Sequence, residues 1–120
     1  MRILIIDDDL HAMDQLQQLI LHVNPKHDVE TCHSSYEALQ KFRKEHYDIV
    51  FTEIYLQGGM QGNQLITSAP SPTFKVGMAN ALDNPVIRQP FNHFLIKPIT
   101  ENMLQETFAI AKYNIEYPYL

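Results

Sequence analysis

Two short apolar runs, each ending in acidic residues, constrain the fold more than any other feature of this chain. Residues 2–6 run directly into Asp7, Asp8 and Asp9, and residues 49–52 run into Glu53. Short, nearly continuous runs of branched or aromatic side chains are typical of strands buried on both faces, as in a parallel sheet covered by helices. We therefore predict a parallel sheet with carboxylates at the ends of two strands.

Helical patterns separate the predicted strands. The first helix has one apolar stripe at spacings of three and four: Met13, Leu16, Leu19, Ile20 and Val23. Pro25 ends this helix, because proline disfavours a helical residue before it. Residues 29–33 predict the second strand, and Ser34 or Ser35 predicts the N-cap of a helix. That second helix carries Tyr36, Leu39 and Phe42.

The second half of the chain is less regular. Residues 57–62 predict a glycine-containing loop, and residues 63–68 allow only a short helix before Pro70 and Pro72. Residues 74–78 and 93–96 predict the fourth and fifth strands, and Pro85 and Pro90 keep any helix between them short or distorted. Thr100 predicts the N-cap of a last helix with its own stripe: Leu104, Phe108, Ala111 and Ile115. Strands alternating with helices indicate an α/β fold with right-handed crossovers.

Composition limits the class of protein. A length of 120 residues fits one domain, and a net charge of -5 argues against a nucleic-acid surface on it. The single cysteine, Cys32, is expected to be a buried core residue in a reducing compartment. The chain has no apolar run of the roughly 20 residues that a membrane span needs. We expect a cytoplasmic domain that contacts neither nucleic acid nor membrane.

Four charged side chains follow strands whose carboxyl ends are expected to meet. Asp7 and Asp8 follow the first strand, Glu53 ends the third, and Lys97 follows the fifth. Ligands of open parallel sheets bind beyond these strand ends, where the strand order switches. Clustered carboxylates repel one another and favour a cation, and oxygen ligands suit Mg²⁺. Alternatively, Asp8 or Asp9 simply caps the first helix.

The chain resembles the receiver domains of two-component response regulators. The resemblance rests on residues 3–9, on residues 48–56 continuing to Gly62, on residues 94–98, and on residues 37–39 of the second helix. It covers essentially the whole chain and implies a flavodoxin-like (CheY-like) fold, with helices on both faces of a five-stranded parallel sheet. Here the third and fourth helices are expected to be short or irregular. We predict one receiver domain over residues 1–120, and we interpret Tyr113, Tyr117 and Tyr119 as the start of a linker or, alternatively, as a docking edge.

The resemblance also implies roles for site residues. Asp7 and Asp8 match the acidic pair that helps to hold Mg²⁺ beside the phosphoacceptor, so weak Mg²⁺ binding is expected at Asp8, Glu53 and the backbone of Tyr55. Lys97 matches the lysine of the family. The partners implied are a histidine kinase, an effector domain or a second copy of the chain.

Two positions depart from the family pattern. Glu53 stands where the family has its phosphoacceptor aspartate, and its extra methylene moves the carboxylate about 1.5 Å further into the pocket. A misplacement near 1 Å can cost about a hundredfold in rate. Met78 stands where the family has a threonine or serine that binds the phosphoryl group, and methionine offers no hydroxyl. Phe94 stands at the aromatic switch position, although it could equally be a core residue.

These departures favour a signalling module that is not an enzyme, needs no cofactor and acts through protein contacts. In this interpretation, Glu53 reaches toward Lys97 and imitates a phosphorylated aspartate. One alternative is an active receiver that still takes a phosphoryl group from a histidine kinase with Mg²⁺. Another alternative is a small flavodoxin-like cofactor-binding protein, although three aspartates after the first strand would repel a phosphate group.

Overall fold

Five parallel strands form one sheet in the order β2-β1-β3-β4-β5. The computed structural model describes residues 1–81 and 85–118. The strands are β1 (Arg2–Ile6), β2 (Asp28–Cys32), β3 (Ile49–Glu53), β4 (Phe74–Ala79) and β5 (His93–Ile96). This is the flavodoxin-like order, in which the winding reverses between β1 and β3. The predicted α/β fold is confirmed.

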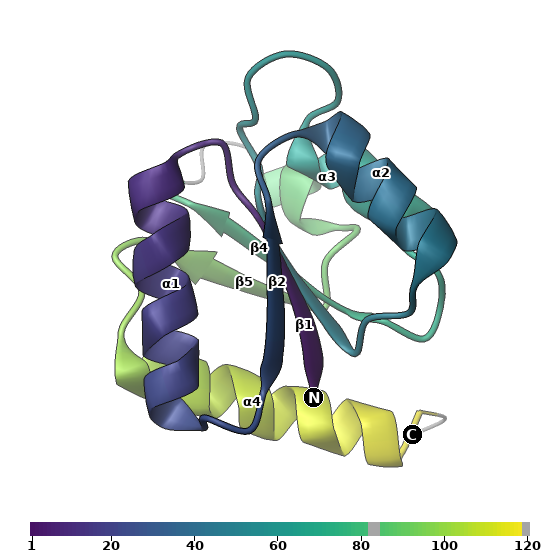
Figure 1. Ribbon diagram of the computed structural model, residues 1–120. Coiled ribbons are helices and arrows are strands. Elements are labelled where there is room, and N and C mark those ends of the chain that lie inside the picture. The colour runs from purple at the N-terminus through teal and green to yellow at the C-terminus, as the bar shows by residue number, and fades with distance from the viewer. Residues whose placement is uncertain (82–84, 119–120) are drawn as a thin grey trace.

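Helices cover both faces of the sheet, as predicted. They are α1 (Leu10–Val23), α2 (Ser35–Lys44), α3 (Gly62–Leu65) and α4 (Glu101–Glu116), with short 3-10 turns at η1 (Ile66–Ser68) and η2 (Pro85–Arg88). Alternate side chains of a strand face opposite sides. Ile3 and Ile5 pack with α1 and α4, whereas Leu4 and Ile6 pack with α2 and α3, and Figure 1 shows α1 and α2 on opposite sides of the sheet.

Polar side chains fix where the long helices begin. Asp9 caps α1 by accepting hydrogen bonds from the backbone N–H groups of His11 and Ala12, each at 3.1 Å. Ser34, not Ser35, caps α2 through the N–H of Glu37 at 3.1 Å. Thr100 caps α4, as predicted. Asp9 is therefore the helix cap, which was one interpretation of the acidic run. Asp7 and Asp8 before it are left for the charged site, which was the other interpretation.

Several boundaries differ from the prediction. β2 begins and ends one residue earlier than expected, and β4 extends one residue further, to Ala79. Tyr36 lies in α2 but is 70% exposed, because the core-facing side of this helix carries Ser35, Ala38 and Phe42, and Tyr36 is not on that side. Ile115 is also exposed, so the buried stripe of α4 ends at Ala111. Helical stripes fade at the ends of helices because the core is narrower than the helix is long.

Only short helical turns are described in the segments between β3 and β4 and between β4 and β5, as predicted. α3 has four residues and continues into η1, and only η2 stands in the described part of the segment between β4 and β5. Cys32 is buried, and burial raises the pKa of its thiol to about 12, as suits a core residue. α4 runs to Glu116, so Tyr113 belongs to the helix and Tyr117 caps it. The predicted linker could begin only after them, and Tyr119 lies outside the described residues.

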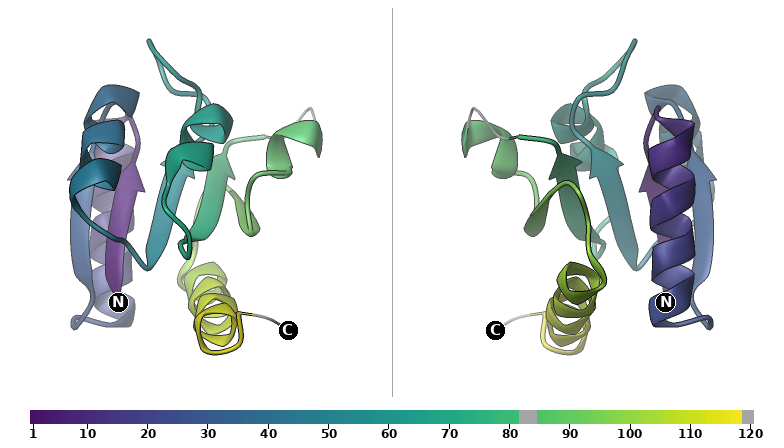
Figure 2. Two further views of the ribbon diagram at one scale, coloured as in Figure 1. Left: turned by 90° about the vertical axis from the view of Figure 1, so that its right-hand side faces the viewer. Right: turned by 90° about the vertical axis from the view of Figure 1, so that its left-hand side faces the viewer.

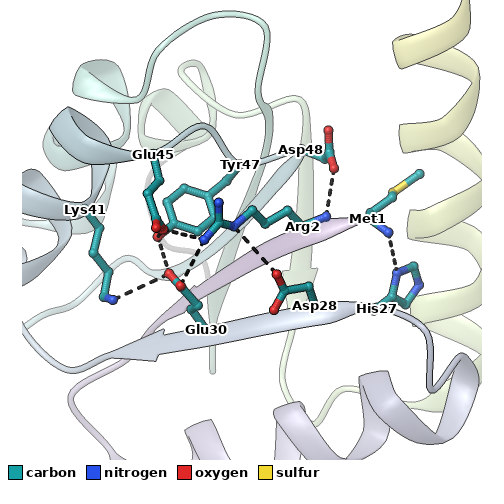
Figure 3. A network of polar contacts seen from close by, with 9 residues as sticks. All are labelled: Met1, Arg2, His27, Asp28, Glu30, Lys41, Glu45, Tyr47 and Asp48. Carbon is teal, nitrogen blue, oxygen red and sulfur yellow. Dashed lines mark hydrogen bonds and ion pairs between the residues drawn. The ribbon is translucent and has the colours of Figure 1, made fainter.

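A polar network ties the amino-terminal end of the sheet together (Figure 3). The Arg2 guanidinium donates to Glu30 on β2 at 3.1 Å and to Glu45, which caps α2, at 2.6 Å. It also lies 5.4 Å from the centre of the Tyr47 ring. The Tyr47 hydroxyl donates to both Glu30 and Glu45. The network joins β1, the edge strand β2 and the segment that leads into β3.

The loop after β3 projects beyond the carboxyl ends of the strands (Figures 1 and 2). Side chains hold it at three points. The N–H of Gln57 donates to Asp8 Oδ2 at 2.8 Å, the N–H of Met60 to Ser35 Oγ at 3.2 Å, and the N–H of Leu56 to Gln61 Oε1 at 3.0 Å. The loop is thereby fastened to the end of β1 and to the start of α2.

Candidate functional site

The carboxyl ends of β1, β3 and β5 bring Asp7, Glu53 and Lys97 together. The Lys97 ammonium donates to Asp7 Oδ2 at 3.0 Å and lies 3.2 Å from Glu53 Oε2. The contact with Glu53 is an ion pair. Asp7 and Glu53 are 2% and 8% exposed, so one ammonium serves two buried carboxylates. The structure thus brings together Asp7, Glu53 and Lys97, but not Asp8, whose carboxylate accepts from Gln57 in the loop.

Burial dominates the electrostatics of Glu53. Burial raises the pKa of Glu53, the positive charge of Lys97 opposes that rise, and the negative charges of Asp7 and Asp8 add to it. Burial alone would lower the pKa of Lys97, yet the hydrogen bond to Asp7 and the charges of Asp7 and Glu53 together raise it. The surroundings therefore favour the cationic form of Lys97, whereas burial disfavours the charged form of Glu53.

Met78 supplies part of the apolar surroundings of Glu53. The strand register pairs Glu53 on β3 with Met78 on β4, so both side chains lie on the same face of the sheet. Met78 is fully buried among the core residues of that face. A thioether at this place donates no hydrogen bond. The site thus combines a buried carboxylate with a neighbour that cannot hold an anionic oxygen.

Asp8 points away from the buried ion pair toward the loop. Asp8 Oδ2 accepts the hydrogen bond from the N–H of Gln57, and Asp8 is half-buried. Tyr55, whose backbone was a candidate metal ligand, has a 47% exposed side chain in the same loop. Within residues 1–81 and 85–118, no three His, Cys, Asp or Glu side chains gather closely enough to hold a metal ion. A cation here would therefore rely on two carboxylates, a backbone oxygen and water.

Phe94 lies on the other face of the sheet. It pairs in register with Gly77 and packs edge-on against Phe91, with ring centres 6.0 Å apart. The Arg88 guanidinium lies 5.3 Å from the centre of the Phe94 ring. A Cβ at Gly77 would lie only 2.7 Å from that ring, so glycine is needed for the close approach. The structure places this candidate switch residue beside η2 and half-buried, rather than next to Glu53.

The sequence did not single out Gln57, Ser35 or Gln61 as residues that shape the site. Gln57 acts through its backbone N–H, which leaves no signal in the residue type. Ser35 was considered only as a helix cap, but its hydroxyl accepts from the loop. The one available signal was the placement of polar residues at the ends of neighbouring strands, whose loops must meet.

Comparison with known proteins decides the family. The pattern of the family described as response regulator receiver domain matches residues 3–109 of the chain. The chain belongs to the response regulator receiver domain family. Receiver domains of this family generally act in signalling rather than in catalysis, and they interact with kinases and effector domains.

Individual relatives agree with this assignment. An uncharacterised response regulatory protein of Shewanella oneidensis is 30% identical over 116 residues, which are 93% of this chain and 49% of that protein. The chain thus spans about half the length of this curated relative. A two-component response regulator from Clostridium difficile is similar in structure, with a TM-score of 0.82, 21% identity, and coverage of 95% of this chain and 97% of that one.

A third relative was solved with a ligand. The response regulator protein TrrA from Thermotoga maritima, in complex with Mg²⁺ and BeF, matches with a TM-score of 0.80 and 18% identity. The match covers 92% of this chain and 97% of that chain. At these identities the two solved structures show the shared fold alone. Among the described residues, no helix has both the length and the apolar character required to cross a membrane.

Proposed function

We propose that this receiver domain signals through protein contacts without being phosphorylated at Glu53. The observation that carries the proposal is the position of Lys97, whose ammonium already contacts both Asp7 at 3.0 Å and Glu53 at 3.2 Å. In this arrangement the Glu53 carboxylate takes the place that an anionic phosphoryl group would need beside the lysine. The Glu53 side chain thereby takes a position beside Lys97 that does not depend on phosphorylation.

The chemistry of phosphoryl transfer supports the proposal. Transfer depends on in-line positioning and on groups that stabilise the charge of the phosphoryl oxygens. The longer Glu53 side chain changes the position of the attacking oxygen, and Met78, its neighbour in register, supplies no donor. Both changes act on the same step. We infer that neither the attacking group nor the oxyanion contact is suited to acyl phosphate formation.

Mg²⁺ would be held by Asp8, Glu53 and the backbone oxygen of Tyr55. Receiver domains typically bind this ion for phosphorylation, and two carboxylates with several waters suit its preferred coordination. When bound, the ion would neutralise the charge of the carboxylates and of any phosphoryl group. Lys97 competes for Glu53, and Gln57 already occupies one oxygen of Asp8. We therefore propose weak Mg²⁺ binding that signalling does not require.

The proposed role is a protein-contact module in a two-component or phosphorelay pathway of the cytoplasm. A kinase, an effector domain or a second copy of the chain would recognise the fixed conformation. The curated relative from Shewanella is about twice as long as this chain, and the activity of any longer protein that contains this domain also belongs to the proposal. The proposal assigns no catalytic residue to the domain.

Incubation with a small-molecule phosphodonor and Mg²⁺, followed by intact-mass spectrometry, tests the proposal. We expect the wild-type chain to gain no phosphoryl group. The double variant Glu53→Asp with Met78→Thr restores both groups of the family pattern and is expected to gain one. Stoichiometric phosphorylation of wild-type Glu53 would overturn the proposal.

An active receiver is the second candidate function. The observation in its favour is that Asp7, Asp8 and Lys97 all stand at the carboxyl ends of the strands, with Lys97 and Asp7 in direct contact. In that case Glu53 would accept the phosphoryl group itself. The same mass measurement separates the two candidates, because only an active receiver gains mass without the double substitution.

A further inference from the structure

Two nitrogen atoms meet at the amino-terminal end of the sheet, far from the charged site at the carboxyl ends of the strands. The amino group of Met1 lies 3.1 Å from His27 Nδ1, and Figure 3 shows the two groups facing each other. An ammonium group has hydrogens to donate and no lone pair with which to accept. His27 Nδ1 is therefore the acceptor, and its lone pair points at the amino nitrogen of Met1.

The contact of His27 differs in kind from those of other histidines in the chain. His22 Nε2 lies 3.9 Å from a carboxylate oxygen of Glu101, and His33 Nδ1 lies 3.1 Å from a carboxylate oxygen of Glu37. His27 faces a second nitrogen instead. Because that nitrogen belongs to the main chain, the pair has no signal in the pattern of side chains.

Local contacts hold both nitrogens in place. The His27 ring stacks on the Phe108 ring, with centres 4.7 Å apart and an angle of 27° between the planes. The backbone N–H of His27 donates to the Asn24 oxygen at 3.2 Å, and the carbonyl of Met1 accepts from the N–H of Asp28 at 3.0 Å. Donors that are already positioned lose less conformational freedom when they bind a ligand.

The distance between the two nitrogens suits a metal chelate. Nitrogen ligands lie about 2.0–2.1 Å from a zinc ion. Two nitrogens 3.1 Å apart would then subtend an angle of roughly 95–100° at the ion. This value lies between the angles of square-planar and tetrahedral coordination, which Cu²⁺ and Zn²⁺ respectively prefer. A metal ion would fit between the two groups with little movement of either one.

The chemistry of the donors selects the class of metal. Imidazole nitrogen suits Cu²⁺, Ni²⁺ and Zn²⁺, with Cu²⁺ bound most tightly, whereas Mg²⁺ prefers oxygen ligands. Burial is the main cause that lowers the pKa of His27, and the positive charge of the amino group adds to it, against a smaller rise from the hydrogen bond with Met1. The surroundings thus favour the neutral imidazole that a metal requires.

We propose that the amino group of Met1 and Nδ1 of His27 together bind one divalent transition-metal ion, with Cu²⁺ favoured over Zn²⁺. On binding, the amino group releases the proton that it shares with His27, and water fills the remaining positions of the ion. The bound ion would join the residue before β1 to the residue before β2. The inference does not depend on the proposed function, because neither nitrogen belongs to the charged site.

Titration calorimetry with CuCl₂, in a buffer that does not bind the metal, tests this inference. The chain carries an unmodified Met1 amino group, which intact-mass spectrometry checks. Two altered forms each remove one nitrogen: His27→Gln removes the imidazole, and acetylation of the Met1 amino group removes the basic amine. The acetylated form keeps every side chain, so it decides the question even if His27→Gln disturbs the packing on Phe108.

The matched control is His33→Gln, which removes an imidazole that faces a carboxylate of Glu37. We expect the wild type to bind one Cu²⁺, and each altered form to bind it at least about tenfold more weakly. His33→Gln and an excess of Mg²⁺ should leave the Cu²⁺ affinity unchanged. Electron paramagnetic resonance should show two nitrogens on the copper in the wild type and fewer in either altered form.

Three results would overturn the inference: no stoichiometric Cu²⁺ binding by the wild type, unchanged affinity in the acetylated form, or an equal loss of affinity in His33→Gln. Phosphorylation of wild-type Glu53 would overturn the proposed function alone, since the copper titration reports on the opposite end of the sheet. The two proposals can therefore fail separately.

Discussion

The charged site depends on one residue, Lys97, through its ammonium group. It is the cation that faces both Asp7 and Glu53, at 3.0 and 3.2 Å, and its side chain is only 18% exposed. A buried charge that loses its partner is much more costly than a buried pair. Glu53 is in a different position, because removal of its charge leaves Lys97 still bonded to Asp7. The two members of the ion pair should therefore respond unequally to substitution.

Lys97→Met is expected to destabilise the domain by about 3 kcal/mol at neutral pH, because it leaves two buried carboxylates without a cation. Glu53→Gln is expected to stay within about 1 kcal/mol of the wild type. The substitution loses the attraction to Lys97, but it also removes the desolvation cost of a buried charge, which is what raises the pKa of Glu53. Urea unfolding of both variants measures this difference. Equal losses of stability would contradict the asymmetry.

The pH dependence of the same variants follows from the sign of the pKa shifts. Without Lys97, the folded-state pKa of Glu53 rises further above its unfolded value, because the positive charge that opposes the effect of burial is lost. A carboxyl group with a raised folded pKa destabilises the folded state only when it is ionised. The loss of folding stability therefore grows as pH rises above its unfolded pKa and through its folded pKa. The stability gap between Lys97→Met and the wild type should therefore be smallest in acid and should widen toward neutral pH.

Mg²⁺ affinity should respond to Lys97 as well. Because the ammonium competes with the ion for Glu53, Lys97→Gln is expected to strengthen Mg²⁺ binding, by about tenfold if the lost competition is worth 1.4 kcal/mol. Titration calorimetry measures the affinity, and Lys75→Gln, on β4 and outside the site, is the matched control. Tight Mg²⁺ binding by the wild type would contradict the competition.

At the scale of elements, the loop after β3 depends on two glycines for different reasons. An added Cβ at Gly62 would overlap the backbone oxygen of Glu53 and lie 2.9 Å from Ile54 Cα. Gly58 has a φ of 68° but nothing within 4 Å of the added Cβ. Gly62→Ala is expected to cost about 3 kcal/mol through the backbone clash. Gly58→Ala is expected to cost about 1 kcal/mol through backbone strain alone.

Urea unfolding compares the two glycine variants. Beyond the difference in stability, Gly62→Ala should shift the amide signals at the end of β3, since the clash is with Glu53 itself. Gly58→Ala should disturb only the projecting loop. If both variants lose the same stability and leave the signals of β3 unchanged, the close approach of Gly62 to β3 does not matter for the site.

How well elements could be predicted depended on burial. The bounds of β1, β3 and β5 agree with the sequence, and β1 and β3 are buried almost throughout. The prediction displaced β2, an edge strand whose residues are mostly half-buried, by one residue, although it placed β5, the other edge strand, correctly. Tyr36 was placed in the right helix, but local spacing did not show that the buried face of this helix carries Ser35 and Ala38 instead.

At the scale of the whole molecule, the Arg2 network closes the end of the sheet opposite the charged site. The hydrogen bond from Tyr47 is the largest cause of the lowered pKa of Glu30, ahead of burial, which opposes it, and of the positive charges of Lys41 and Arg2. A carboxyl group with a lowered folded pKa stabilises the fold above its unfolded pKa and loses that contribution as pH falls through the folded pKa. Part of the acid sensitivity of the domain should thus arise here.

Tyr47→Phe is expected to lower stability at neutral pH by about 1.5 kcal/mol, because Glu30 and Glu45 lose a buried hydroxyl donor. The stabilities of variant and wild type should begin to converge as pH falls below about 4.3, the ordinary pKa of glutamate, and should come closest below the lowered folded pKa of Glu30. Urea unfolding as a function of pH measures this, with Tyr36→Phe, an exposed tyrosine, as control. A constant difference at every pH would show that Glu30 plays no part.

The charged site was predictable and the Arg2 network was not. Asp7, Glu53 and Lys97 follow parallel strands, and the topology of such a sheet gathers its carboxyl ends at one edge. No local sequence pattern connects the charged residues of the network, because Arg2, Glu30 and Glu45 are far apart in the sequence. Each of them alone is a charged residue of the kind expected on any protein surface. The direction of Asp8 toward Gln57 likewise depends on the course of a loop, which residue types alone do not determine.

Titration with beryllofluoride, which imitates a phosphoryl group, in the presence of Mg²⁺ tests the central claim most directly. Two-dimensional amide spectra would be recorded for the wild type and for Glu53→Asp with Met78→Thr. We predict no specific shifts at Asp8, Glu53 or Lys97 in the wild type, because the Glu53 carboxylate and Lys97 already pair, and saturable shifts in the double variant. Saturable shifts at these residues in the wild type would contradict the claim that the domain acts without a phosphoryl group at Glu53.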